Sequence, residues 1–174
     1  MRKTYIYDEV ERLVRKCKSR NPFDILSALN VVVMESNAYQ KLKGYCFSAN
    51  RTIYVVINDS LHPSEKNMVA AHELAHIVLH RKMLRLAPMK DNILYDMTSE
   101  TEYEANLFAA DLLITDDVIS DMSKDADMDY FRMCQTLSIS PDLMSFKLFS
   151  LIKRGYAYPM PPIDMDCTFL GKEK

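Results

Sequence analysis

The sequence predicts an α+β fold, in which a small, mainly antiparallel three-stranded sheet packs on one central helix and on further helices. Three observations lead to this expectation. The strand signals gather between residues 31 and 57, an almost entirely apolar stretch follows at residues 68–80, and a second helical pattern follows at residues 98–114. Strands that are grouped before helices favour an α+β layer over alternating βαβ units.

Composition places the chain among globular proteins. It has 174 residues, 48% of them hydrophobic, and a formal net charge of -2. A chain of this length can bury a core, and its hydrophobic content is too high for a disordered protein. The balanced charge supplies no basic surface stripe, so we expect no direct nucleic-acid partner.

The sequence contains no pattern typical of a membrane-spanning segment or of a signal peptide. No apolar run approaches the ~20 residues that cross a bilayer, and the charged N-terminus lacks the apolar core of a signal peptide. The cysteines are far apart and form no Cys-x-x-Cys pair, which indicates free thiols in a reducing compartment; they are Cys17, Cys46, Cys134 and Cys167. We therefore expect a cytoplasmic protein without a membrane partner.

Two helices are predicted at the start of the chain. Apolar residues recur at helical spacing within residues 5–19, and Asn21-Pro22 ends that helix, because the residue before a proline is pushed out of the helical region. A shorter helix is expected at residues 22–29, with Pro22 in its first turn.

Three strands are predicted next. Residues 31–35 form a β-branched run, and residues 44–47 and 52–57 flank a tight turn. The second and third strands are therefore expected to form a hairpin, and residues 52–57 give the strongest strand signal in the chain. Proteases commonly hold an extended substrate against the edge of a sheet, and either edge of this sheet is a candidate.

The central helix carries the polar residues of greatest interest. Apart from His72, Glu73 and His76, every residue from Met68 to Leu79 is apolar, and a helix that is apolar on nearly all sides is normally buried. Residues four apart share a helical face, so the two imidazoles can converge on one ion, while Glu73, roughly 100° round the helix, can reach a water on that ion. His-Glu-x-x-His is the zinc-protease pattern in which the glutamate is the general base. The alternative is a buried helix whose histidines have protein partners.

The remaining segments are expected to be mostly helical. Residues 81–97 show little periodicity and are predicted to be a loop, while residues 98–114 form a second core helix with a polar start. Two further helices are expected at residues 130–137 and 141–154. Ser140-Pro141 indicates the start of the second, with Ser140 as N-cap and Pro141 in the first turn. Ser64 is the expected N-cap of the central helix.

A catalytic zinc ion usually has three protein ligands, and the second core helix offers Glu102 and Glu104 as the third. The two carboxylates point about 200° apart on a helix, so only one can face the ion. We expect Glu102, because it shares a face with Asn106, whose amide oxygen can support a ligand histidine. Glu104 stays the alternative ligand or a pocket residue. Either glutamate can instead cap the helix, after Ser99 or Thr101.

His80 continues the histidine series by one more turn. It lies roughly 6 Å of rise beyond His76 and about 80° round the helix from His72, so the three imidazoles cannot easily share one ion. We expect His80 to support the ligands or to line the pocket edge. It is also a candidate oxyanion donor, together with Tyr95 and Tyr103.

The stretch HELAHIVLH at residues 72–80, followed by ETEYEANLFAADLLI at residues 100–114, resembles the ImmA/IrrE family of metallopeptidases. That family shows His-Glu-x-x-His and then Glu-x-Glu-Ala-Asn-x-Phe-Ala-x-x-Leu-Leu, which matches this sequence from Glu102 to Leu113. The family usually has a proline shortly after the leucine pair, where this chain has Ile114-Thr115-Asp116. That departure concerns only the end of the helix.

The resemblance implies a zinc-dependent, gluzincin-like endopeptidase with one zinc ion, which we place on His72, His76 and Glu102, and with Glu73 as the catalytic base. It also implies a protein substrate, such as a transcriptional repressor of a phage or mobile element. The main alternative is a regulatory or binding protein that a metal merely stabilises, in which Glu73 has no role.

We expect a single metallopeptidase domain over residues 1–174. Residues 1–60 supply helices and the sheet, residues 61–115 supply the zinc-site helices, and residues 116–174 supply a C-terminal helical cap and tail.

Overall fold

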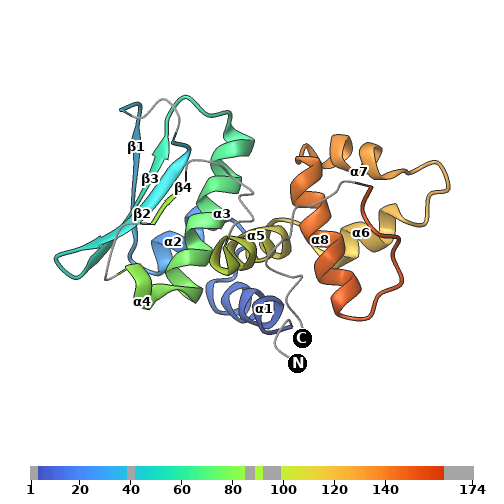
Figure 1. Ribbon diagram of the computed structural model, residues 1–174, viewed down its shortest axis with the longest axis horizontal. Helices are drawn as coiled ribbons and strands as arrows, with labels where there is room; N and C mark the ends of the chain where they lie inside the picture. The colour runs from blue at the N-terminus through green and yellow to red at the C-terminus, as the bar shows by residue number, and fades with distance from the viewer. Residues whose placement is uncertain (1–3, 39–41, 85–88, 92–98, 163–174) are drawn as a thin grey trace.

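A small sheet stands beside a central helix, and the remaining helices extend away from it (Figure 1). The computed structural model describes residues 4–38, 42–84, 89–91 and 99–162. Within those residues the elements are α1 Tyr5–Cys17, α2 Pro22–Ala28, β1 Val32–Ser36, β2 Gly44–Ala49, β3 Thr52–Asn58, α3 Pro63–Leu79, α4 Arg81–Leu84, β4 Met89–Asp91, α5 Glu100–Leu113, α6 Asp116–Met122, α7 Tyr130–Leu137 and α8 Pro141–Lys153. The predicted α+β class is confirmed.

The sheet has the strand order β1-β3-β2-β4. Strands β2 and β3 form the predicted antiparallel hairpin, and the turn residues Asn50 and Arg51 both have positive φ angles, of 50° and 65°. Positive φ at both central residues is what a two-residue hairpin turn of type I′ requires. Strand β1 pairs with β3 in parallel, so the sheet is mixed, although most of its pairings are antiparallel.

The prediction of a loop over residues 81–97 is wrong in two places. Residues Arg81–Leu84 form the short helix α4, and Met89–Asp91 form a fourth strand, which pairs antiparallel with β2. Elements of three or four residues are too short to show a periodicity, so only the pairing with β2 defines this strand. Helix α6 lies at Asp116–Met122, a segment for which the sequence predicts no separate helix.

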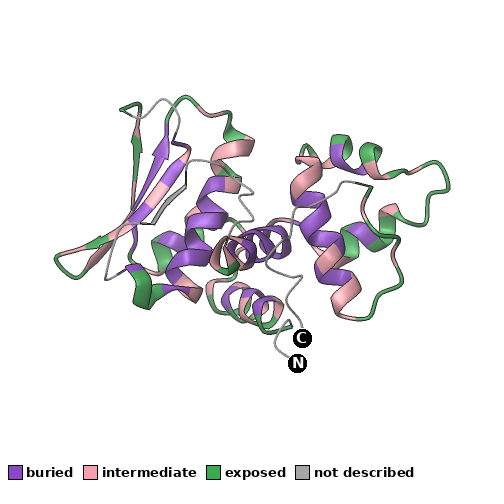
Figure 2. Cartoon of the chain, viewed as in Figure 1, coloured by how far each residue is buried: buried purple, intermediate pink, exposed green. Residues whose placement is uncertain are grey.

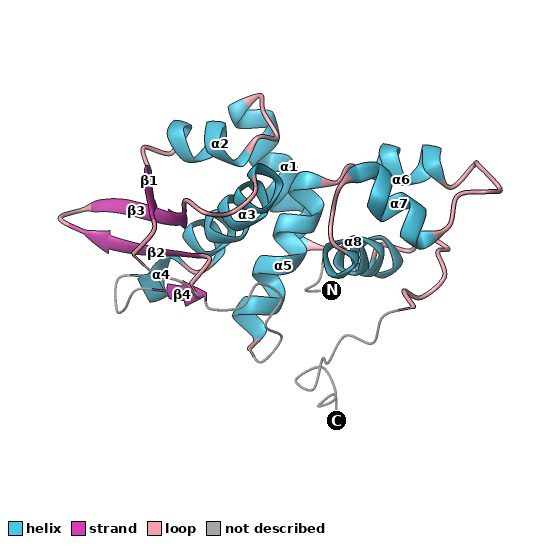
Figure 3. Cartoon of the chain, turned by 90° about the horizontal axis from the view of Figure 1, so that it is seen from above, coloured by secondary structure: helices cyan, strands magenta, loops and turns pink. Residues whose placement is uncertain are grey.

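Helix α3 lies against the sheet on one side and against α5 on the other (Figures 1 and 3). It begins two residues earlier than expected: His62 rather than Ser64 is the N-cap, and the His62 ring accepts a hydrogen bond from the Ser64 backbone N–H. All residues from Val69 to Ile77 are buried, which Figure 2 shows as a continuous purple stretch. The predicted burial of this helix is therefore confirmed.

Helix α5 joins the two ends of the molecule, because it contacts α3, α1 and α8 (Figure 3). Its C-terminal half is fastened by a buried ion-pair cluster. Lys147 Nζ lies 2.9 Å from Asp111 Oδ1 and 2.6 Å from Asp116 Oδ1. Ser150 donates to Asp111, at 2.6 Å, and Arg154 donates twice to Asp116, at 2.5 and 2.9 Å.

The same cluster sets the ionisation of Asp116. Burial alone raises the pKa of this carboxyl, but hydrogen bonds from Arg154 and Lys147 outweigh burial, so its pKa lies well below the ordinary value. Asp116 is therefore an anion at neutral pH, as the two cations around it require.

The structure bears on two expectations, which concern membrane-spanning helices and the state of the cysteines. Among the described residues, none of the helices combines the length and the apolar character needed to span a bilayer. Cys17 and Cys134 are free thiols, while Cys167 lies outside the described residues.

Candidate metal centre

Three ionisable side chains lie inside the most buried part of α3. His72, Glu73 and His76 are 1%, 0% and 0% exposed. Helical spacing places the two histidines one turn apart on the face that looks toward α5. The cost of burying such groups is large unless partners compensate for the lost water.

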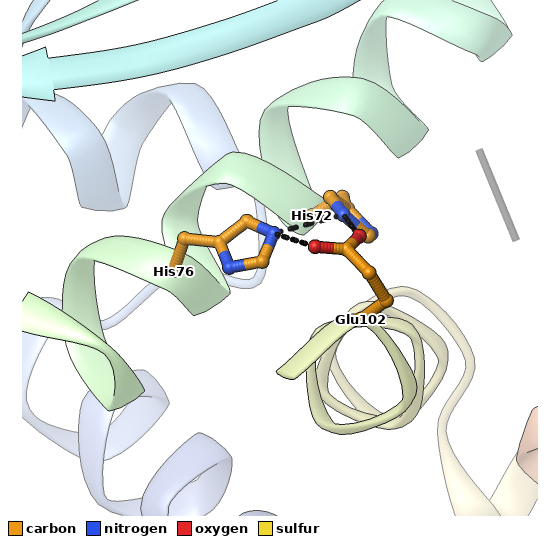
Figure 4. A group of neighbouring side chains, drawn as sticks. All are labelled: His72, His76 and Glu102. Carbon is orange, nitrogen blue, oxygen red and sulfur yellow. Dashed lines mark hydrogen bonds and ion pairs between the residues drawn. The ribbon is translucent and has the colours of Figure 1, made fainter. Parts of the chain in front are cut away.

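The two imidazoles converge with one carboxylate from α5. His72 Nε2 lies 3.1 Å from His76 Nε2. The Glu102 carboxylate approaches both, with Oε2 at 3.1 Å from His72 Nε2 and Oε1 at 3.5 Å from His76 Nε2. Figure 4 shows the three side chains pointing toward one point between the helices.

This cluster has the donor set and the spacing of a metal site. Ligand atoms about 2.0–2.1 Å from a tetrahedral ion lie about 3.3 Å apart, close to the separations of 3.1, 3.1 and 3.5 Å. Two Nε2 atoms at 3.1 Å cannot both carry a hydrogen along the line that joins them, so at least one directs a lone pair at the cluster. A bound cation would satisfy the imidazole lone pairs and the Glu102 carboxylate at the same time.

Asn106 fixes the other nitrogen of His72. Its Oδ1 lies 2.9 Å from His72 Nδ1, and an amide oxygen only accepts, so His72 Nδ1 donates. In a neutral imidazole Nε2 then carries the lone pair, facing His76 and Glu102. Asn106 is itself 1% exposed, so the amide is held rigidly one turn after Glu102 on α5.

Glu104 takes a different position from Glu102. Its Oε2 lies 2.9 Å from His80 Nε2, and its Oε1 accepts a hydrogen bond of 2.5 Å from the Tyr5 hydroxyl. His80 Nδ1 lies 3.0 Å from His76 Nδ1. The structure thus brings Glu102 to the paired Nε2 atoms and Glu104 to the outer side of the histidine series.

Burial shifts the titration of two of these outer groups. Burial lowers the pKa of His80, although the hydrogen bond with Glu104 acts in the opposite direction, and the imidazole is neutral at pH 7. Burial, and then the hydrogen bond to Glu104, raise the pKa of Tyr5 far above its ordinary value. The Tyr5 hydroxyl therefore keeps its proton and acts as a donor.

Helix capping does not occupy the Glu102 carboxylate. Ser99 is the N-cap of α5, and its hydroxyl accepts from the Glu102 backbone N–H at 3.2 Å. The backbone of Glu102 thus belongs to the cap while its side chain reaches the histidines. Ser99 therefore caps the helix while the Glu102 carboxylate still lies at the candidate metal site.

Glu73 points toward the sheet rather than toward α5. A Cβ atom added to Gly44, the first residue of β2, would lie 3.4 Å from Glu73 Oε1 and 2.4 Å from Val69 Cγ1. The strand therefore approaches α3 so closely that a side chain at residue 44 fits only if Val69 shifts. Sequence reasoning did not single out Gly44, although a glycine at the start of a strand is a known sign of close approach.

The remaining candidates lie elsewhere. The Tyr103 ring is buried against Phe146, and its hydroxyl accepts a hydrogen bond from Lys153 of α8. Tyr95 lies outside the described residues. Tyr5 had no signal in the sequence, because its partner Glu104 is 99 residues away.

Comparisons with known proteins agree with this architecture. The family model described as the IrrE N-terminal-like domain, Peptidase M78, matches residues 26–149. A protein of Bacillus phage phi105, named Uncharacterized immunity region protein 2, is 36% identical over 117 residues, which cover 67% of this chain and 73% of the phage protein. The family match includes α3 and α5, whereas α1 precedes it.

Proposed function

This chain belongs to the IrrE N-terminal-like family, Peptidase M78, and from that premise we propose that it is a zinc-dependent endopeptidase that cleaves a partner regulatory protein. The observation that carries the proposal is the convergence of His72, His76 and Glu102 from two packed helices. Membership of a peptidase family supports a protein as the substrate.

The proposed metal ligands are His72 Nε2, His76 Nε2 and the Glu102 carboxylate. Two imidazoles and one carboxylate form a ligand set that suits catalytic zinc and leaves one position open. When bound there, zinc supplies Lewis acidity, which lowers the pKa of a water toward ~7 and polarises the scissile carbonyl. Asn106 keeps the His72 lone pair directed at this site through its hydrogen bond to Nδ1.

Glu73 is the proposed catalytic base. It takes a proton from the attacking water as the new carbon–oxygen bond forms. It then delivers that proton to the amide nitrogen as the carbon–nitrogen bond breaks, which releases a carboxylic acid and an amine. Its complete burial between α3 and β2 supports this role, because a desolvated carboxylate is a stronger base than an exposed one.

A regulatory protein of a phage or mobile element is the proposed substrate. The relative from Bacillus phage phi105 is named after an immunity region, which supports a regulator such as a transcriptional repressor. We propose that the substrate docks along the outer edge of β4. Strand β4 pairs with β2 at Gly44, and Gly44 lies beside Glu73, so this edge is near the proposed base. An extended segment can add to such an edge through main-chain hydrogen bonds.

We also propose that residues 1–174 work as one domain. Helix α5 supplies Glu102 near its start and Asp111 near its end, so the metal site and the C-terminal helices share one rigid element.

The test incubates the full, zinc-loaded chain with a candidate regulatory protein and measures fragments by mass spectrometry. Glu73→Gln keeps the shape of the side chain and removes the base. We expect it to retain zinc and to lose about 10²–10⁴-fold in cleavage rate. Glu65→Gln is the matched control, because it changes a partly exposed carboxylate on the same helix.

Two results contradict the proposal. Cleavage by Glu73→Gln near the wild-type rate removes Glu73 from the mechanism. Full silencing of the regulator by Glu73→Gln, without any fragments, supports the metal-stabilised binding protein instead.

A further inference from the structure

A chain of hydrogen bonds runs from α1 to the back of His76. The Tyr5 hydroxyl donates to Glu104 Oε1 at 2.5 Å, Glu104 Oε2 lies 2.9 Å from His80 Nε2, and His80 Nδ1 lies 3.0 Å from His76 Nδ1. The chain therefore links three helices, α1, α5 and α3, and ends on a proposed metal ligand. We call these residues the Tyr5–Glu104–His80 relay.

One arrangement of protons satisfies every member of the relay and also leaves the lone pair of His76 Nε2 directed at the metal site. A carboxylate only accepts, so Tyr5 and His80 Nε2 both donate to Glu104. His80, whose hydrogen is on Nε2, offers the lone pair of Nδ1 to the N–H of His76 Nδ1. His76 carries its hydrogen on Nδ1 and its lone pair on Nε2, which faces His72 and Glu102.

Burial makes this arrangement hard to exchange for another. The His80 and Glu104 side chains are 7% and 20% exposed, and His76 is fully buried, so water cannot easily replace a lost partner. The Glu104 bond to His80 also involves a charged acceptor, and charge-assisted hydrogen bonds are roughly twice as strong as neutral ones.

We propose that Tyr5, Glu104 and His80 are positioning residues, which hold His76 in the tautomer whose Nε2 lone pair faces the metal site. The inference rests on the proposed function only in that His76 binds a metal ion. It extends the working site to α1, which lies before the region matched by the family model. Helix α1 thus sets metal affinity through one hydroxyl group.

The experiment measures the zinc dissociation constant of the full-length protein by competition with a chromophoric chelator. Loss of an outer hydrogen-bond partner typically weakens metal binding about 10–100-fold, and we expect that range for Glu104→Ala. Glu104→Gln keeps a neutral acceptor and should restore part of the affinity. Tyr5→Phe should weaken binding measurably, by up to about 10-fold, because Glu104 stays in place.

The matched control is Glu100→Ala, which removes an exposed carboxylate from the same first turn of α5. It lowers the negative charge near the site by the same amount without removing a member of the relay; its charge acts on the Tyr5 hydroxyl only through space. We expect its zinc affinity to stay close to wild type. Thermal unfolding of each metal-free variant shows whether the protein is folded before its affinity is compared.

A second readout reports which ring nitrogen of His80 carries the hydrogen. Imidazole ¹⁵N chemical shifts of the zinc-loaded protein should show His80 protonated on Nε2 in the wild type. In Glu104→Ala that preference should be lost. A purely structural role for Glu104 lowers stability without changing which His80 nitrogen carries the hydrogen.

Three outcomes overturn the relay: equal zinc affinity in Glu104→Ala and Glu100→Ala, wild-type affinity in Tyr5→Phe, or a wild-type His80 protonated on Nδ1. Tyr5→Phe changes a partly exposed residue, so it tests the relay even if Glu104→Ala does not fold. None of these measurements needs proteolysis. A zinc-binding protein without peptidase activity refutes the proposed function alone, and an active enzyme with unchanged affinities refutes the relay alone.

Discussion

Replacing Lys147 by methionine should reveal how strongly the buried ion-pair cluster holds the C-terminal helices to α5. Lys147 Nζ is fully buried and contacts Asp111, whose side chain is 1% exposed, and Asp116, whose side chain is 18% exposed. Methionine fills the space of the lysine stem but cannot neutralise either carboxylate. The variant therefore leaves buried negative charge with fewer partners.

The expected loss of stability follows from that burial. Removing one partner of a buried ion pair typically costs about 3–5 kcal/mol. Asp111 keeps its hydrogen bond from Ser150 and Asp116 keeps those from Arg154, so we expect the lower end, about 3 kcal/mol. For a domain of this size each kcal/mol shifts Tm by about 2–4 °C, which gives a decrease of about 6–12 °C.

Thermal unfolding followed by circular dichroism measures this shift. Lys124→Met is the matched control, because Lys124 pairs with Asp121 at 2.6 Å while both side chains are 72% exposed. An exposed pair of the same kind contributes little, so the control should leave Tm unchanged. A Tm for Lys147→Met that equals the control value would refute the reasoning that burial, not the ion pair itself, decides the cost.

The remaining predictions concern the ligands, the close approach of the strand, and acid stability. Glu102→Ala should emerge from gel filtration without zinc, whereas Glu104→Ala should still bind one equivalent when zinc is in excess; the reverse pattern exchanges their roles. Gly44→Ala places a Cβ 2.4 Å from Val69 Cγ1 and should cost about 1–3 kcal/mol in urea unfolding; an unchanged urea midpoint contradicts the tight contact. The folded-state pKa of Asp116 is lowered, so its stabilisation is complete above the unfolded value of about 3.9 and is lost as pH falls below it. Asp116→Asn should therefore lose less stability than the wild type between pH 6 and pH 3, and parallel curves would exclude this contribution.

Local sequence determined the longer helices and the hairpin of this protein. Apolar patterns and capping residues predict α1, α3, α5, α7 and α8 to within a few residues, because a helix is built from contacts between residues three and four apart. The turn at Asn50 and Arg51 is equally local. The pattern shared by α3 and α5 was also sufficient for the family, which the match over residues 26–149 confirms.

Local sequence also predicted part of the geometry around the histidines. The i, i+4 spacing of His72 and His76 is a property of one helix, and so is the opposite direction of Glu102 and Glu104. The structure places Glu102 beside the two Nε2 atoms and Asn106 beside His72 Nδ1. The roles of these residues as ligands and support stay predictions until metal binding is measured.

Contacts between distant segments were decided only by the tertiary structure. Strand β4 is defined by its pairing with β2, Gly44 lies against Glu73 across two elements, and Tyr5 reaches Glu104 from 99 residues away. No periodicity in the chain encodes which residues meet across such distances, because their meeting depends on how whole helices and strands pack together. The sequence by itself therefore determined the longer helices, the hairpin, the family and the residues with metal-binding chemistry, whereas packing decided the short elements and what surrounds the site.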